Sequence, residues 1–200
     1  MKENETNIRV CRVSMTYPTK QRPGVGRHAY HTSNIMKYPV LVLTKHAEQN
    51  YFEPDKHVNL TAIKYPHKRF KPRIWKNVLH NIKCVMIYGF GQILFLIKSI
   101  KHLNDFRPTI VHLQSPHSFL IGLYCKIKWK SKVVLTFHGG DYYSVKNSTL
   151  WKRILSFSDE ICAISESHLP TLKKMFPHCE CVHTPSAVDV SIFNDLKLTR

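Results

Sequence analysis

The sequence predicts an α/β fold in which helices cover a Rossmann-like, doubly wound parallel sheet. Short runs rich in Val, Ile and Leu alternate with longer segments of helical periodicity. These short runs are almost solidly apolar, which is typical of strands that are buried on both faces. With 200 residues, 43% of them hydrophobic, the chain is long enough for one domain with its own core.

Strands are expected where β-branched and apolar residues run together between turn residues. In chain order, the expected strands are Ile8–Ser14, Val40–Thr44, His57–Tyr65, Thr109–Leu113, Lys132–Phe137, Glu160–Ile164 and Glu180–Thr184. Helices are expected between them, because a crossover between parallel strands needs one. A glycine turn at 24–29 enters the first, and the others are expected near Trp75–Leu103, Ser118–Lys128, Leu150–Phe157 and Glu166–Met175.

The chain is strongly basic, with 30 Lys and Arg against 13 Asp and Glu and a formal charge of +17. Such a charge attracts phosphates, acidic lipids or nucleic acid. Two basic runs that are interleaved with aromatic residues, Lys64–Lys76 and Lys126–Lys132, suit an anionic membrane surface or nucleic acid, or are solvated basic faces. Because the cations are spread along the chain without a DNA- or RNA-binding motif, we expect no nucleic-acid partner.

The six cysteines are scattered and form no CxxC pair, which favours a reduced, cytoplasmic protein. Cys179 and Cys181, with His178 and His183 nearby, form the one cluster that a metal could use. A strand whose side chains alternate between two faces explains the same spacing, so no metal site is expected.

The beginning and the longest apolar run of the chain bear on its location. The first ten residues mix acidic and basic side chains and do not read as a secretory leader. The longest apolar run, Cys84–Ile97, has fourteen residues, whereas a membrane-spanning helix needs about 20. We therefore expect a cytoplasmic protein, at most peripheral on the inner face of the cell membrane.

A glycine motif follows the first expected strand, where ligands of doubly wound sheets bind. Residues 24–29 match G-x-G-x-x-A, the dinucleotide fingerprint. That interpretation fails twice, because about ten residues separate Ser14 from Gly24 and the second strand ends without an acidic residue. Backbone amides at this turn, with Arg27 and His28 beside them, remain a candidate anion site, and a glycine loop without a ligand is the alternative.

A second glycine motif, His138-Gly139-Gly140-Asp141, follows the strand Lys132–Phe137. The glycines let the backbone approach a ligand closely, and His138 can hydrogen-bond a sugar hydroxyl or a phosphate. A structural histidine at a strand end is the alternative. Ser165 lacks the flanking glycines of a hydrolase nucleophile, so we expect it to cap a helix.

Taken together, these segments resemble the N-terminal domain of glycosyltransferase family 4 enzymes, which have the two-domain GT-B architecture. The resemblance runs in order from about Ile8 to Asn194. It rests on six segments, which are VSMTYP followed by GVGRH, VLVLT, IVHLQSP, VVLTFHGGD, ICAISES and HTPSAVDVSIFN.

The resemblance implies sugar transfer from a nucleotide-sugar donor without an obligatory metal or other cofactor, the donor being a co-substrate. It assigns His138 as the catalytic residue facing the transferred sugar, and Gly24, Gly26 and Arg27 to the loop that faces the donor phosphates and the acceptor. Gly139 and Asp141 would lie near the sugar. Negative charge grows on a departing nucleotide diphosphate, so a phosphate site lined by backbone amides fits this reaction.

The sequence also departs from the family pattern. Pro23 stands where the family's loop usually begins with a glycine, and residues 186–189 read S-A-V-D in place of N-G-V-D. The family's donor-binding E-x7-E pair is absent, since no two of the seven glutamates stand eight apart. We therefore expect residues 1–194 to form the acceptor-binding domain, residues 195–200 to begin the interdomain linker, and the donor-binding domain to be absent from this chain.

The function expected from these observations is that of the N-terminal half of a retaining hexosyltransferase in surface polysaccharide or glycolipid synthesis, with little activity alone. Its partners would be a nucleotide-sugar donor, a saccharide or lipid-linked acceptor, and a donor domain, which a separate chain could supply. The alternative is a non-catalytic, basic binding module that associates with anionic membranes.

Overall fold

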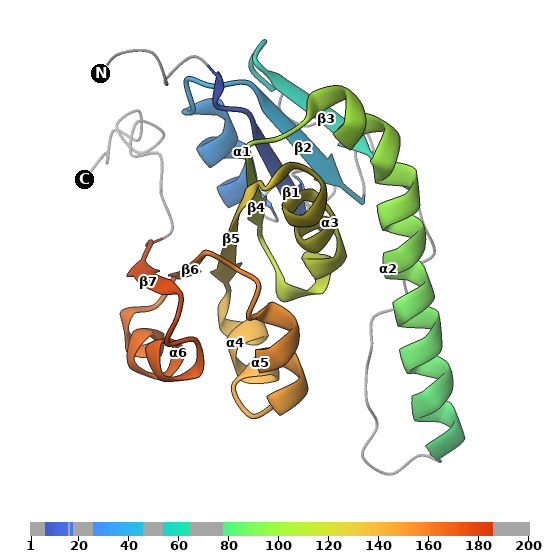
Figure 1. The fold of residues 1–200 in the computed structure, drawn as a ribbon, viewed down its shortest axis with the longest axis vertical. Helices are drawn as coiled ribbons and strands as arrows, with labels where there is room; N and C mark the ends of the chain where they lie inside the picture. Colours follow the sequence, from blue (N-terminus) through green and yellow to red (C-terminus); the bar gives the residue numbers. More distant parts are fainter. Residues whose placement is uncertain (1–6, 16, 18–25, 46–53, 65–77, 186–200) are drawn as a thin grey trace, which may run out of the picture.

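A seven-stranded parallel sheet forms the centre of the computed structural model, which describes residues 7–15, 17, 26–45, 54–64 and 78–185 (Figure 1). The strand order is β3-β2-β1-β4-β5-β6-β7, and every pairing is parallel. The strands are β1 (Val10–Ser14), β2 (Val40–Thr44), β3 (Val58–Ala62), β4 (Ile110–Leu113), β5 (Lys132–Phe137), β6 (Glu160–Ala163) and β7 (Glu180–His183). The predicted Rossmann-like α/β class is confirmed.

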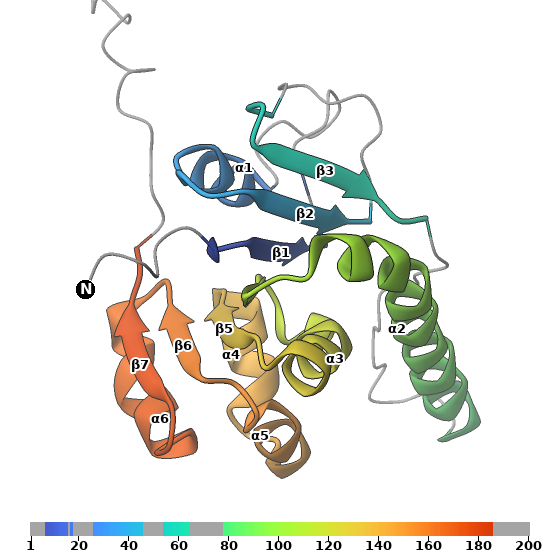
Figure 2. The same cartoon turned by 45° about the horizontal axis from the view of Figure 1, so that its top comes forward.

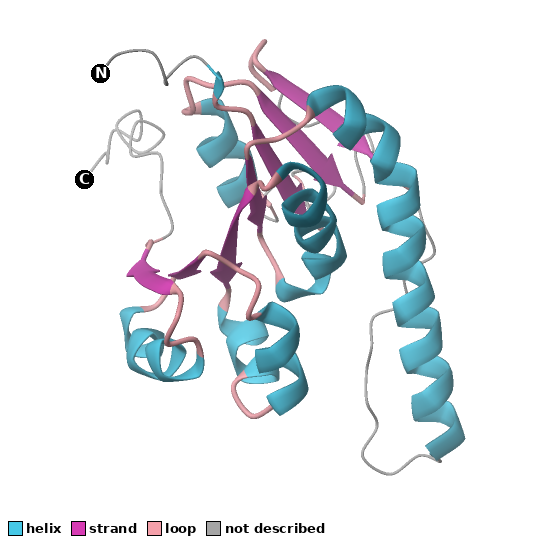
Figure 3. Ribbon diagram, in the orientation of Figure 1, coloured by secondary structure: helices cyan, strands magenta, loops and turns pink. Residues whose placement is uncertain are grey.

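Helices flank the strands, as Figure 3 shows. The α-helices are α1 (Arg27–Asn34), α2 (Val78–Phe106), α3 (Phe119–Trp129), α4 (Gly139–Val145), α5 (Thr149–Leu155) and α6 (Leu169–Met175). Two short 3-10 turns, η2 (Pro116–Ser118) and η3 (Glu166–His168), precede α3 and α6. Within the described ranges, no helix is both long and apolar enough to cross a membrane.

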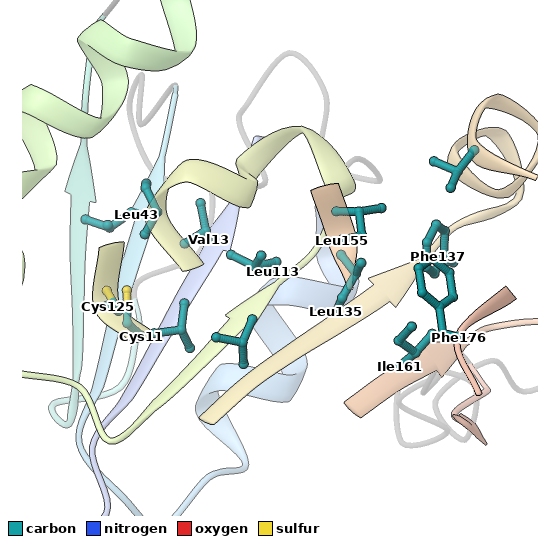
Figure 4. Packing of buried hydrophobic residues seen from close by; sticks show 14 of the residues in the cluster. Cys11, Val13, Leu43, Leu113, Cys125, Leu135, Phe137, Leu155, Ile161 and Phe176 are labelled. Atoms are coloured by element: carbon teal, nitrogen blue, oxygen red, sulfur yellow. The ribbon is translucent and has the colours of Figure 1, made fainter. Parts of the chain in front are cut away.

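The two faces of the sheet carry separate apolar clusters because side chains alternate along each strand. On one face, Cys11 and Val13 of β1 join the larger cluster, which includes residues of α2, α3, α5 and α6. Figure 4 shows this packing, from Leu43 on one side to Phe137 and Phe176 on the other. On the opposite face, Val10 packs with residues of β2, β3 and α1 in a smaller cluster.

Chain order and strand order diverge at β1, and this divergence positions the site. Going outward from β1, the chain adds β2 and β3 on one side, and β4 to β7 on the other. Loops that follow β1 and β4 therefore diverge at the carboxyl ends of these strands, and in open α/β sheets ligands bind in the resulting crevice.

Helix α3 lies close against the sheet at Gly122. A Cβ atom at this position would stand 2.8 Å from Leu113 Cδ1 and 3.2 Å from Val133 Cγ1. The missing side chain lets the helix pack directly on β4 and β5.

Candidate functional site

The candidate site lies at the carboxyl ends of β1, β4 and β5. Gly26 begins α1 with a φ of 82°, a left-handed conformation that favours glycine. Its carbonyl oxygen accepts a hydrogen bond from the Tyr30 amide, which closes the first turn of the helix. Gly24 and the side chain of Arg27 lie outside the described residues, so their predicted phosphate contacts remain predictions.

His28, in this first helical turn, meets His138 from the other glycine motif. The two imidazole rings lie edge to face, with their centroids 6.1 Å apart (interplanar angle 83°). Two loops that are more than 100 residues apart in the sequence thus meet at one point of the sheet edge.

A chain of hydrogen bonds runs from His138 back into β4. Its Nε2 lies 3.4 Å from Gln114 Oε1, and the Gln114 amide nitrogen lies 3.2 Å from His112 Nε2. The Thr136 hydroxyl is 2.7 Å from the same His112 nitrogen. With this amide orientation, Gln114 donates to the His112 ring and its oxygen accepts from the His138 ring. Neutral His138 therefore carries its proton on Nε2 and keeps Nδ1 as an acceptor.

Burial keeps these imidazoles neutral. Desolvation lowers the pKa of His138, and it lowers the pKa of His28 with additional effects from the charges of Arg12, His138 and His31. The pKa of His112 is lowered well below its ordinary value, again mainly by desolvation. At neutral pH His138 is therefore a neutral hydrogen-bonding group.

Arg12, which the sequence patterns did not single out, lies directly beneath α1. Its side chain is 1% exposed, and Nη1 donates to the Ala29 carbonyl oxygen at 3.3 Å. Its Nε is buried without a hydrogen-bond partner in the described structure. Burial lowers the pKa of Arg12 to about 10, so it is still charged at neutral pH. The available signal was a single arginine inside the apolar strand IRVCRVS.

Gly139, Gly140 and Asp141 form the first turn of α4, where a glycine loop had been expected. A Cβ at either glycine would meet nothing within 4 Å, so the space beside them is open. The Ser115 hydroxyl lies 3.4 Å from Asp141 Oδ1 and joins the loops after β4 and β5. Burial raises the pKa of Asp141 to about 6, although Ser115 and the His138 backbone lower it in part.

A ring stack connects α4 to the loop after β6. The rings of Tyr142 and His168 are parallel within 8°, with their centroids 3.9 Å apart, and both side chains are buried. Ser165 precedes η3 at a cap position, but its hydroxyl contacts Ser167 and makes no side-chain cap bond. The expected cap is correct in position only.

The Cys179–Cys181 cluster lies around β7, the outermost strand beyond β6, and its polar atoms contact carbonyl oxygens. Cys179 Sγ is 3.0 Å from Ser158 O, and the Nε2 atoms of His178 and His183 are 2.8 Å from Ser156 O and 3.2 Å from Ile164 O. No group of three or more His, Cys, Asp or Glu side chains suited to a metal ion occurs among the residues described.

The family model described as Glycosyltransferase Family 4 matches residues 24–192. No curated protein sequence matches the chain significantly.

Solved structures with a similar fold are GT-B glycosyltransferases. Sucrose-phosphate synthase from Thermosynechococcus elongatus is 12% identical with a TM-score of 0.64, over 93% of this chain and 50% of that one. Anabaena HepE in complex with UDP-glucose is 10% identical with a TM-score of 0.58, over 94% and 46% of the two chains. Arabidopsis thaliana UGT89C1 complexed with UDP-L-rhamnose is 12% identical with a TM-score of 0.60, over 91% and 52%.

At these identities the likeness shows the fold, and the present chain spans about half the length of these enzymes.

Proposed function

Because this chain belongs to Glycosyltransferase Family 4, we propose that the carboxyl edge of its sheet forms the acceptor-facing half of a sugar-transfer site. The reaction would be retaining transfer of a hexose from a nucleotide-sugar to a saccharide or lipid-linked acceptor, in surface polysaccharide or glycolipid synthesis. The observation that carries the proposal is the neutral His138, held by Gln114 and packed against His28 where the sheet order diverges.

Residues 1–194 are proposed to form this lobe, with a linker from 195 and the donor held by a second domain, in this polypeptide or another. HepE and UGT89C1, whose structures hold UDP-glucose and UDP-L-rhamnose, support a nucleotide-sugar donor. The reaction would need no metal or organic cofactor and would take place in the cytoplasm, where single, unpaired cysteines stay reduced.

His138 is the proposed catalytic residue. Its Nδ1 would accept a hydrogen bond from a sugar hydroxyl, and a neutral ring would avoid fixing a second charge at the reacting centre. The amides of the turn at Gly24 and Gly26, with Arg27, would stabilise the charge that grows on the departing diphosphate. Gly139 leaves open space for the sugar, and Asp141 would fix the His138 turn through Ser115.

The test is ligand binding to the 200-residue chain, measured by saturation-transfer NMR with a panel of saccharides, lipid-linked saccharides and nucleotide-sugars. At least one saccharide or lipid-linked saccharide should bind the wild type and lose its signal in His138→Ala. His178→Ala is the matched control, because this exposed histidine lies near β7, away from the site.

Three outcomes would contradict parts of the proposal. Saccharide binding that survives His138→Ala would remove His138 from the site. Tight donor binding without acceptor binding would reverse the assignment of the lobe. Rapid transfer by the chain alone would show that no second domain is needed.

A further inference from the structure

Helix α2 exposes apolar side chains on the side opposite its buried face. Gln92, Phe95 and Ser99 are at most 3% exposed and face the sheet. The opposite side carries what we call the α2 stripe, whose exposed fractions are 68% for Met86, 59% for Phe90, 49% for Ile93 and 56% for Ile97. At about 100° per residue, these four side chains lie within an arc of roughly 60°. Four large apolar side chains on the solvent side of a helix that already buries its other side indicate a second, apolar environment.

The α2 stripe stands clear of the other described elements. Helix α2 has 29 residues, and in Figures 1 and 2 its amino-terminal half extends beyond the strands with no other described helix or strand beside it. Its carboxyl-terminal half packs on the core through Phe95 and Leu103. The α2 stripe therefore starts on the protruding half and continues along the outer side of the packed half, over about 16 Å of helix.

The stretch of sequence that contains the α2 stripe is strongly basic. Between residues 56 and 104 the sequence has ten Lys and Arg and no Asp or Glu. Of these, Lys98 and Lys101 are exposed on α2 itself, just beyond the carboxyl end of the stripe. Cations beside an apolar stripe are the pattern of a helix that lies in an anionic lipid interface.

Other occupants fit the α2 stripe less well. A second copy of this chain would bring another +17 charge against the same basic segment. Nucleic acid would satisfy the cations but offers no apolar surface for Met86, Phe90, Ile93 and Ile97. We propose that α2 lies on the surface of an anionic lipid bilayer, with the α2 stripe buried among the headgroups and upper acyl chains.

This orientation places the bilayer near the candidate site. Helix α2 runs antiparallel to the strands, since it ends just before the amino end of β4, so its protruding half lies toward the carboxyl edge of the sheet. The lipid contact does not depend on the sugar-transfer proposal. If both hold, the acceptor is the lipid-linked kind, presented from the bilayer to the edge that carries His138.

The experiment is co-sedimentation of the full chain with vesicles of phosphatidylcholine alone and of phosphatidylcholine with phosphatidylglycerol in equal parts. We expect binding to the anionic vesicles that weakens with added salt. The double variant Phe90→Ser/Ile97→Ser should bind at least about tenfold more weakly, since each large apolar side chain is worth about tenfold when buried. No donor or acceptor is present, so this result is independent of the transfer proposal.

The matched control is Ile35→Ser/Leu150→Ser, which removes two equally exposed apolar side chains elsewhere, 73% and 67% exposed, and should bind as the wild type does. Lys98→Gln/Lys101→Gln should weaken binding without changing the stripe, and it serves as the test if the first variant fails to fold. Wild-type chain that stays in solution at low salt would overturn the proposal. Equal binding by the stripe variant, or dimers that form without lipid and depend on the stripe, would do the same.

Discussion

At the scale of single residues, the notable feature is a charged arginine that is buried beneath α1 and has no carboxylate partner among the described residues. Arg12 donates to the Ala29 carbonyl oxygen, and its charge adds to the larger effect of burial in lowering the pKa of His28 and of His112. A buried charge costs stability unless it is well paired. The Arg12 charge thus reinforces the neutral state that burial already favours for these imidazoles.

Replacing this charge should change the titration of both histidines. In Arg12→Met the pKa values of His28 and His112 should rise, because the repulsion between the guanidinium and each imidazolium is gone. NMR titration of the imidazole protons measures this directly. The free energy of unfolding should stay equal or increase, since a buried apolar side chain replaces a buried charge. Unchanged pKa values in a folded variant would show that the arginine does not act on these rings.

The raised pKa of Asp141 should make its contribution to stability depend on pH. Its folded pKa of about 6 lies above its ordinary value of 3.8, so its contribution to stability is present at low pH and is lost as pH rises toward 6. Asp141→Asn should therefore raise the free energy of unfolding by about 2 kcal/mol at pH 7 and leave it nearly unchanged at pH 4. Urea unfolding at the two pH values measures it, with the exposed Asp105→Asn as control. A gain of equal size at both pH values would point to a cause other than ionisation.

At the scale of elements, the strands were easier to predict than the helices around the site. β2 and β5 occupy the predicted residues, because β-branched, apolar runs that are buried on both faces have no competing periodicity. Helix α4 was not predicted, since Gly139 and Gly140 disfavour a helix in isolation. Burial of Tyr142 and Val145 in its last turns stabilises it through tertiary packing, which no local pattern shows.

The candidate site was predicted only in part. His138, Gly26 and His28 were found because glycine turns after apolar strands mark a sheet edge. Arg12 and His112 were not, since one polar residue within a strand carries no periodic signal. Arg12 and His112 come close to His28 and Gln114 only because β1 pairs with β4, which joins residues about 100 positions apart in the sequence.

Two helix glycines should respond oppositely to the same change. Gly122→Ala in α3 should lower the free energy of unfolding by about 1–2 kcal/mol, because the added Cβ would stand 2.8 Å from Leu113 Cδ1. Gly89→Ala in α2 meets nothing within 4 Å and should raise it by about 0.5–1 kcal/mol through helix propensity. Chemical denaturation of both variants measures the difference. The same change in both would mean that packing on the sheet does not fix α3.

At the scale of the whole molecule, buried histidines make stability sensitive to mild acid. Burial lowers the folded pKa of His28, His112, His117 and His138. As pH falls below the unfolded value of about 6.5, the unfolded chain binds protons that the folded chain does not, so stability is lost. Asp141 binds a proton in the folded chain between about pH 6 and 4, which raises stability as the pH falls. This single group offsets only part of the loss caused by the four histidines.

The free energy of unfolding should therefore fall between pH 7 and pH 5, with a slope of at most about 1.4 kcal/mol per pH unit for each histidine. Urea titrations at several pH values measure this slope. His112→Gln should reduce it by close to one proton, and the exposed His178→Gln should leave it unchanged. A flat profile in the wild type would show that the histidines are protonated in the folded chain.

The pairing of β1 with β4 also affects the order in which the fold can form. The pair is joined at its start by hydrogen bonds between Arg9 and Thr109, which are 100 positions apart in the sequence. A ribosome has to deliver β2, β3 and α2 before β4 exists, and closing so long a loop is entropically costly and slow. The edge that holds His28 and Gln114 together is thus assembled late in folding, and a chain interrupted before β4 has the glycine turn but no site for it to face.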